Sequence, residues 1–90
     1  MKIVRDKEYL SQLKNILTYI KKDKKLASKK FKEKLDAKIN DIPLNPYIHR
    51  KSHFFDDENY RDLIYKGYVV IYKIKKDEIW ILEIFKWIER

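Results

Sequence analysis

The sequence predicts an α+β fold with the element order β-α-α-β-β-β, in which a helix hairpin packs on one face of a mainly antiparallel four-stranded sheet. Two observations predict it. Apolar residues recur every three or four positions through the first 42 residues, and at every second position from residue 60 onward. The chain has 90 residues, 44% of them hydrophobic, and no cysteine, so we expect a single domain over residues 1–90 that packing alone stabilises.

The first half of the chain is expected to form a short strand and two helices. Residues 2–6 alternate as in a strand, and the Asp6 side chain is suited to cap the helix that follows. Apolar stripes at helical spacing run through residues 10–20 and 27–42, separated by a lysine-rich segment. Because this connection is short and polar, the two helices should form an antiparallel hairpin. Pro43 should end the second helix, since the residue before a proline avoids helical conformation.

The second half is expected to begin with a loop over residues 44–58 and to continue with three strands. Residues 60–65 and 68–74 alternate with a period of two around a Lys-Gly turn that contains the chain's only glycine. The last strand, at residues 79–85, is apolar on both faces, which indicates a position inside the sheet. These three strands complete the predicted antiparallel meander.

The positive charge is concentrated in the predicted hairpin. The chain carries 22 Lys and Arg against 14 Asp and Glu, for a net charge of +8, and residues 21–38 contain nine lysines against three acidic residues. Lysine predominates over arginine, which favours a solvated helix face over specific phosphate or base recognition, because the planar arginine fork is better suited to that task. A basic domain that binds nucleic acid through this segment is the alternative interpretation.

No segment predicts a membrane or secreted protein. The apolar stretch at residues 79–88 is interrupted by Glu83 and Lys86 and is shorter than the roughly 18 residues that a membrane span requires. The chain also reaches charged residues too early after Met1 for a secretory signal. We therefore expect a cytoplasmic protein without a membrane partner.

Three motifs follow one another in the strand-rich half: Tyr60-Arg61-Asp62-Leu63, then Gly67-Tyr68-Val69-Val70-Ile71-Tyr72, then Ile79-Trp80-Ile81-Leu82-Glu83-Ile84. In this order and spacing, and together with the Ala, Phe, Leu, Ile and Pro pattern of the helical half, they resemble the RelE/ParE superfamily of toxins from bacterial type II toxin–antitoxin pairs. The resemblance implies a toxin that arrests growth or stabilises a plasmid, needs no cofactor and is neutralised by a cognate antitoxin. It spans nearly the whole chain.

The superfamily divides by target. RelE-like members are described as ribosome-dependent RNases that cut mRNA, and in that case the catalytic residues here would be Arg61, Lys86 and Arg90. Leu63 and Val69, however, stand where RelE-like members carry basic residues, so half of the charge needed around the reacting phosphate is missing. We therefore favour a ParE-like toxin that inhibits DNA gyrase and is not itself an enzyme. For Arg61 a structural role, with its guanidinium on a nearby carboxylate or carbonyl, is equally compatible with the sequence.

Candidate contact residues are basic, aromatic or leucine side chains. Trp80 and Trp87 lie seven positions apart, so a regular strand would place them on opposite faces, with one beneath the helices. His49 and His53 lie in a predicted loop without a third ligand, so we expect no metal site. We expect target contacts, with gyrase or with ribosome-bound mRNA, at Arg50, Lys51, Arg61, Trp87 and Arg90. We expect antitoxin contacts at Leu10, Leu13, Leu17 and Trp80.

Overall fold

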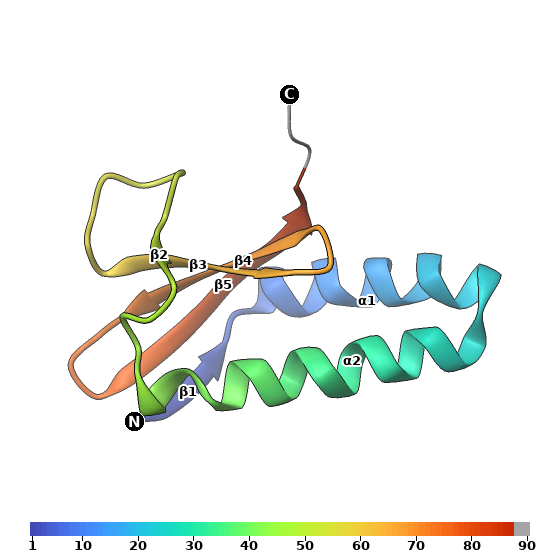
Figure 1. Ribbon diagram of the computed structural model, residues 1–90, viewed down its shortest axis with the longest axis horizontal. Coiled ribbons are helices and arrows are strands. Elements are labelled where there is room, and N and C mark those ends of the chain that lie inside the picture. Colours follow the sequence, from blue (N-terminus) through green and yellow to red (C-terminus); the bar gives the residue numbers. More distant parts are fainter. Residues whose placement is uncertain (88–90) are drawn as a thin grey trace.

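The two helices and the sheet form two layers in the computed structural model, which describes residues 1–87 (Figure 1). The predicted α+β class, the helix hairpin and the mainly antiparallel sheet are confirmed, and the sheet has five strands because a two-residue strand is added at one edge. The elements in chain order are β1 (Lys2–Arg5), α1 (Lys7–Asp23), α2 (Lys25–Asn40), the 3-10 helix η1 (Ile42–Leu44), β2 (Arg50–Lys51), β3 (Tyr60–Tyr65), β4 (Tyr68–Ile74) and β5 (Glu78–Lys86).

The helix hairpin follows from local sequence signals. The Asp6 carboxylate accepts a hydrogen bond from the Glu8 backbone N–H at 2.9 Å, which caps α1 as predicted. Only Lys24, in extended conformation, separates the two helices, so the connection is shorter than the lysine-rich segment suggested. Opposite this turn, the Ser28 hydroxyl donates to the Leu17 carbonyl at 2.9 Å and ties the helices together. Beyond α2, the chain turns through η1, which contains Pro43.

The sheet has the strand order β1-β5-β4-β3-β2 (Figure 1). β1 runs parallel to β5, and the other neighbours are antiparallel. β5 lies between β1 and β4, inside the sheet as predicted. The turn between β3 and β4 has positive φ at both Lys66 (47°) and Gly67 (81°), which is the backbone twist that a two-residue hairpin requires. The strand β2 lies within the predicted loop, where two residues pair with the free edge of β3.

A β-bulge in β5 determines where its side chains point. Ile71 pairs with Glu83 but Tyr72 pairs with Ile81, so Leu82 is an extra residue on β5. Because of this extra residue, Ile81 and Ile84 both point to the helices although they are three positions apart. Residues before the bulge and residues after it therefore alternate between the faces in opposite order. As a result Trp80 and Trp87 lie on the same face of the sheet, and the prediction of opposite faces is wrong. Neither belongs to the core beneath the helices.

The two faces of the sheet are covered differently. On the face toward α1 and α2, here called the helix face, a continuous apolar core is buried, and none of its residues is more than 8% exposed. On the opposite face, here called the loop face, the loop of residues 52–58 between β2 and β3 projects on the side of the sheet away from the helices (Figure 1). Phe54 of this segment packs on Phe85 with ring centroids 5.1 Å apart. The largest buried side chains of the helix face are those of Tyr9, Leu35, Ile39, Ile42, Leu63, Tyr72, Ile79, Ile81 and Ile84.

Candidate functional site

Arg61 is fully engaged in contacts within the chain. Its Nε donates to the Glu58 carbonyl at 2.8 Å, its Nη1 to the His49 carbonyl at 3.2 Å and its Nη2 to the Glu58 carboxylate at 3.0 Å. The guanidinium also lies over the Tyr47 ring, 4.7 Å from its centroid, and the side chain is only 12% exposed. Arg61 thus joins the two ends of the segment between η1 and β3. This geometry is that of a structural residue, because every guanidinium nitrogen already has an acceptor.

The structure does not bring the three candidate catalytic residues together. Arg61 pairs with Tyr72 across the β3–β4 ladder, whereas the exposed Lys86 pairs with Tyr68. Four residues along β4 separate these two positions, which corresponds to about 13 Å. Arg90 lies outside the described residues. Because Arg61 is also held by His49 and Glu58, Arg61 and Lys86 do not form one cluster in this arrangement.

The two positions that lack the basic residues of RelE-like members are core positions. Leu63 and Val69 each have no exposed surface. Leu63 faces the helices, and Val69 lies on the loop face beneath the segment 52–58. A solvated cation at either position would lose its hydration, so this packing is compatible only with apolar side chains. The apolar side chains at these two positions are thus required by the packing of the sheet.

On the loop face, Arg50, Asp62 and Trp87 form one cluster. The Arg50 guanidinium contacts the Asp62 carboxylate at 3.2 Å through both Nε and Nη2, and it lies 5.0 Å from the centroid of the Trp87 ring. Asp62 is almost completely buried and also accepts a hydrogen bond from the His53 backbone N–H at 3.0 Å. Two of the predicted target contacts, Arg50 and Trp87, are therefore neighbours. Sequence reasoning missed Asp62, although an acidic residue inside a strand was a usable signal.

Lys51 lies beside this cluster and is paired with acidic residues. Its ammonium contacts Asp56 at 3.1 Å and Glu58 at 3.8 Å, and the hydrogen bond to Asp56 raises the pKa of Lys51 above its usual value. A shallow hollow, lined by residues 50–56, opens next to the ion pairs. Of the predicted target residues, Arg50 and Trp87 are thus neighbours on the loop face, whereas Lys51 pairs with Arg61 and shares its contact with Glu58 on the other side of the strand.

The predicted antitoxin contacts are divided between two surfaces. Leu10, Leu13 and Leu17 line a groove between α1 and α2, on the side of the hairpin away from the sheet. Leu13 is 5% exposed and forms the floor of this groove, so it belongs to the core and offers little surface of its own. Trp80 lies on the loop face, where the Lys75 ammonium is 4.1 Å from its ring centroid. These four residues therefore do not form a single surface, because the sheet separates Trp80 from the leucines.

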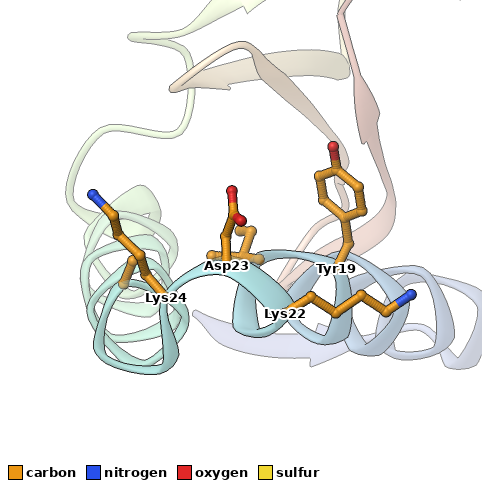
Figure 2. Close-up of a pocket in the computed structure, with 6 residues that line it drawn as sticks. Tyr19, Lys22, Asp23 and Lys24 are labelled. Atoms are coloured by element: carbon orange, nitrogen blue, oxygen red, sulfur yellow. The ribbon is translucent and has the colours of Figure 1, made fainter.

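A second hollow lies at the tip of the hairpin, where α1 and α2 extend beyond the sheet. Figure 2 shows Tyr19 and Asp23 rising on one side of the hairpin, with Lys22 and Lys24 to either side. The labelled charges are of mixed sign, which gives this hollow no clear preference for an anion or a cation. Within residues 1–87, no cluster of His, Cys, Asp and Glu could hold a metal ion, and no helix is long and apolar enough to cross a membrane.

A family model described as the ParE toxin of the type II toxin–antitoxin system parDE matches residues 3–86. The chain belongs to the ParE toxin family. A solved structure described as the chromosomal ParDE toxin–antitoxin system from P. aeruginosa superimposes with a TM-score of 0.80 at 13% sequence identity, covering 98% of this chain and 97% of that one. At this identity the likeness shows a shared fold. No curated protein sequence matches this ParE-family chain significantly.

Proposed function

We propose that this ParE-family protein is a growth-arresting toxin that inhibits DNA gyrase without being an enzyme, and that a cognate antitoxin neutralises it. Family membership over residues 3–86 is the observation that carries the proposal. The packing of Leu63 and Val69 and the engagement of Arg61 support it, because two positions that are basic in RelE-like members are buried and apolar here and Arg61 is held by contacts among residues 1–87. The protein would act in the cytoplasm, where gyrase and its DNA are found.

The proposed contact surface for gyrase is centred on the loop-face pair of Arg50 and Trp87, with Lys51 at the adjoining edge of the sheet. The Arg50 side chain is 34% exposed although its inner edge contacts Asp62, so its outer edge is available to a partner. Arginine and tryptophan side chains that a partner desolvates contribute much of the affinity of protein interfaces. Arg61 would hold the segment that carries Arg50, and the remaining candidate contact, Arg90, lies outside the described residues.

A supercoiling assay with purified gyrase tests the proposed activity. Relaxed plasmid, ATP and gyrase are incubated with increasing amounts of the toxin, and the proposal expects loss of supercoiling at a stoichiometric excess of toxin. Trp87→Ala should weaken inhibition by at least about tenfold. Tyr19→Ala, at the exposed tip of the helix hairpin, serves as a control of similar size. Full supercoiling at a large excess of folded wild-type protein would refute gyrase inhibition.

A second experiment, carried out in cells, distinguishes gyrase inhibition from mRNA cleavage. After brief induction in cells, mapping of mRNA 5′ ends should show no new in-frame cuts. Lys86→Ala should leave growth arrest unchanged, because Lys86 lies at the opposite end of the ladder from Arg61. New cuts that disappear in Lys86→Ala would support a RelE-like nuclease instead. Normal growth together with salt-sensitive nucleic-acid binding would indicate a basic binding domain without toxicity.

A further inference from the structure

The end of the helix hairpin, where α1 and α2 extend beyond the sheet, is the most positively charged part of the molecule (Figure 1). Residues 21–30 contain six lysines and one acidic residue, Asp23, for a net charge of +5. These lysines, here called the tip lysines, come from the last turn of α1, the connection and the first two turns of α2. They are Lys21, Lys22, Lys24, Lys25, Lys29 and Lys30.

The charge of the tip lysines is not compensated within the described part of the chain. All six are exposed, and among residues 1–87 none of them takes part in an ion pair, in contrast to Lys32, which contacts Asp36 at 2.7 Å. Figure 2 shows Asp23 rising on the same side of the hairpin as Tyr19, with Lys22 and Lys24 extending to either side. The end of the hairpin therefore presents its lysines to solvent.

The first turn of α2 carries this charge against the usual preferences of a helix start. Its N-cap is Lys24, which makes no side-chain hydrogen bond, and the first turn has no acidic residue. The N-terminus of a helix is the positive end of its dipole, so lysines there are unfavourable and capping or acidic residues are preferred. Folded proteins break such local rules mainly at functional sites. The lysines are thus better explained by a ligand than by helix stability.

We infer that the end of the hairpin binds the phosphate backbone of duplex DNA without regard to base sequence. Duplex DNA carries one negative charge per about 1.7 Å of its axis, which suits closely spaced ammonium groups. Two neighbouring helices are about 20 Å across, whereas the major groove is about 12 Å wide. The hairpin end therefore lies across the backbone and does not enter the groove. Lysine suffices for such contacts, because they need charge and not the planar arginine fork.

Two other ligands fit the tip lysines less well. An anionic membrane surface is bound best when apolar side chains beside the lysines enter the lipid on one face. Here the exposed apolar residues point apart. Leu26 lines a hollow on the outer side of the hairpin with Leu17, whereas Tyr19 lines one on the sheet side with Tyr68 and Ile84. A second copy of this chain would bring like charges together.

DNA binding would occur without gyrase, so the inference goes beyond the proposed inhibition. Its use by the toxin rests on the proposed function, because duplex DNA is the nucleic acid that gyrase holds. The proposed gyrase contacts, Arg50 and Trp87, lie on the loop face, away from the end of the hairpin. Both surfaces could thus be occupied together, and a weak contact with the DNA would raise the local concentration of the toxin at gyrase.

Fluorescence anisotropy of the full-length toxin with a labelled 20-base-pair duplex tests the inference. Between about 50 and 200 mM salt, the association constant should fall with a log–log slope of about −4, and a duplex of unrelated sequence should bind equally well. Lys21→Glu with Lys25→Glu should weaken binding by at least about tenfold and reduce the slope by about two. The matched control, Lys66→Glu with Lys76→Glu, makes the same change in net charge at exposed turns of the sheet. It should weaken binding less than about threefold.

The outcomes that contradict the inference are distinct. Circular dichroism should first show that both double variants remain folded. Equal weakening in the two would mean that net charge alone matters, which would overturn the site. Tighter binding to anionic phospholipid vesicles or to duplex RNA than to duplex DNA would overturn the ligand.

The supercoiling assay keeps this inference separate from the proposed function. The tip variant should need several times more toxin for half-maximal inhibition of gyrase and should still inhibit fully at excess. Gyrase inhibition by a wild-type toxin that binds no duplex at 50 mM salt would refute the inference alone. Duplex binding without gyrase inhibition would refute only the proposed function.

Discussion

The helix face and the loop face of the same sheet are stabilised in different ways. The helix face buries a continuous set of aliphatic and aromatic side chains under α1 and α2. The loop face depends on a short segment that is attached by the Arg50–Asp62 ion pair and by the contacts of Phe54 with Phe85 and Trp87. The first face follows from local periodicity, whereas the second follows from contacts between residues distant in the chain. The helix face should therefore determine global stability, and the loop face should open locally.

Truncation on the helix face should have the largest effect on stability. Leu35 is fully buried on α2, so Leu35→Ala should lower the free energy of unfolding by about 3 kcal/mol through lost burial and an added cavity. Urea unfolding followed by circular dichroism measures this change. The exposed Leu44 serves as the control, and Leu44→Ala should stay within about 0.5 kcal/mol of the wild type. Equal losses in the two variants would mean that the helix face does not dominate.

Removal of the buried carboxylate should open the loop face and leave the helices intact. Asp62→Ala leaves Arg50 and the His53 N–H without their acceptor, which should cost about 2 kcal/mol, since Arg50 is partly solvated. Hydrogen exchange should rise most for amides of residues 52–58 and least for those of α2. Asp77→Ala, in the exposed turn before β5, is the control. Uniform exchange across both regions would contradict the distinction between the faces.

The buried tyrosine hydroxyls should contribute different amounts to the free energy of unfolding, and the difference should be about that of one hydrogen bond. Tyr72 donates to the Pro46 carbonyl at 2.6 Å, so Tyr72→Phe should cost about 1 kcal/mol. The hydroxyls of Tyr9 and Tyr65 are buried with no hydrogen-bond partner among residues 1–87, and their Phe variants should be neutral or slightly stabilising. Burial raises the pKa of Tyr9 to about 12, so this hydroxyl stays protonated during the measurement. A loss in Tyr9→Phe equal to that in Tyr72→Phe would contradict this assignment.

The smallest effect is expected from the pH dependence at His49. Burial, and then the nearby Lys38, lower the pKa of His49, so the unfolded chain takes up a proton at higher pH than the folded one. Stability should therefore fall as the pH drops from about 7 toward 5. His49→Gln should flatten this dependence by a fraction of a kcal/mol after solvent screening. An unchanged slope in urea unfolding at several pH values would exclude His49 as its source.

The sequence predicted what depends on repeating local patterns. Helical spacing, the Asp6 cap and the alternation of the last strands led to the correct helices, strands and class of fold, because each signal acts within a few residues. Resemblance added the toxin family, which the match over residues 3–86 confirms. Burial of Leu63 and Val69 then supplied a physical reason for the absence of basic residues at those positions.

The parts that sequence could not predict depend on register or on distant partners. The bulge at Leu82 has no signature in the residue pattern, since isoleucines stand on both sides of it, and it reversed the expected side of Trp87. The strand β2 and the Arg50–Asp62 pair require residues twelve positions apart to meet. Arg61 could be assigned to a structural role only when its acceptors at Glu58 and His49 were known. The predicted antitoxin contacts were affected in the same way. The regular spacing of Leu10, Leu13 and Leu17 does not show that Leu13 is buried while Leu10 is exposed.

The bulge also makes tryptophan fluorescence specific for one face of the sheet. Because Leu82 brings both tryptophans to the loop face, fluorescence excited at the red edge of the absorption band, where only indole absorbs, reports on that face alone. Tyrosine emission, by contrast, arises largely from residues packed against the helices. Trp87 lies under the Arg50 guanidinium, so its emission should change as soon as residues 52–58 detach or a target binds. Binding of an antitoxin to the hairpin should leave this fluorescence unchanged. Tryptophan fluorescence could therefore distinguish binding of gyrase from binding of the antitoxin without an added label.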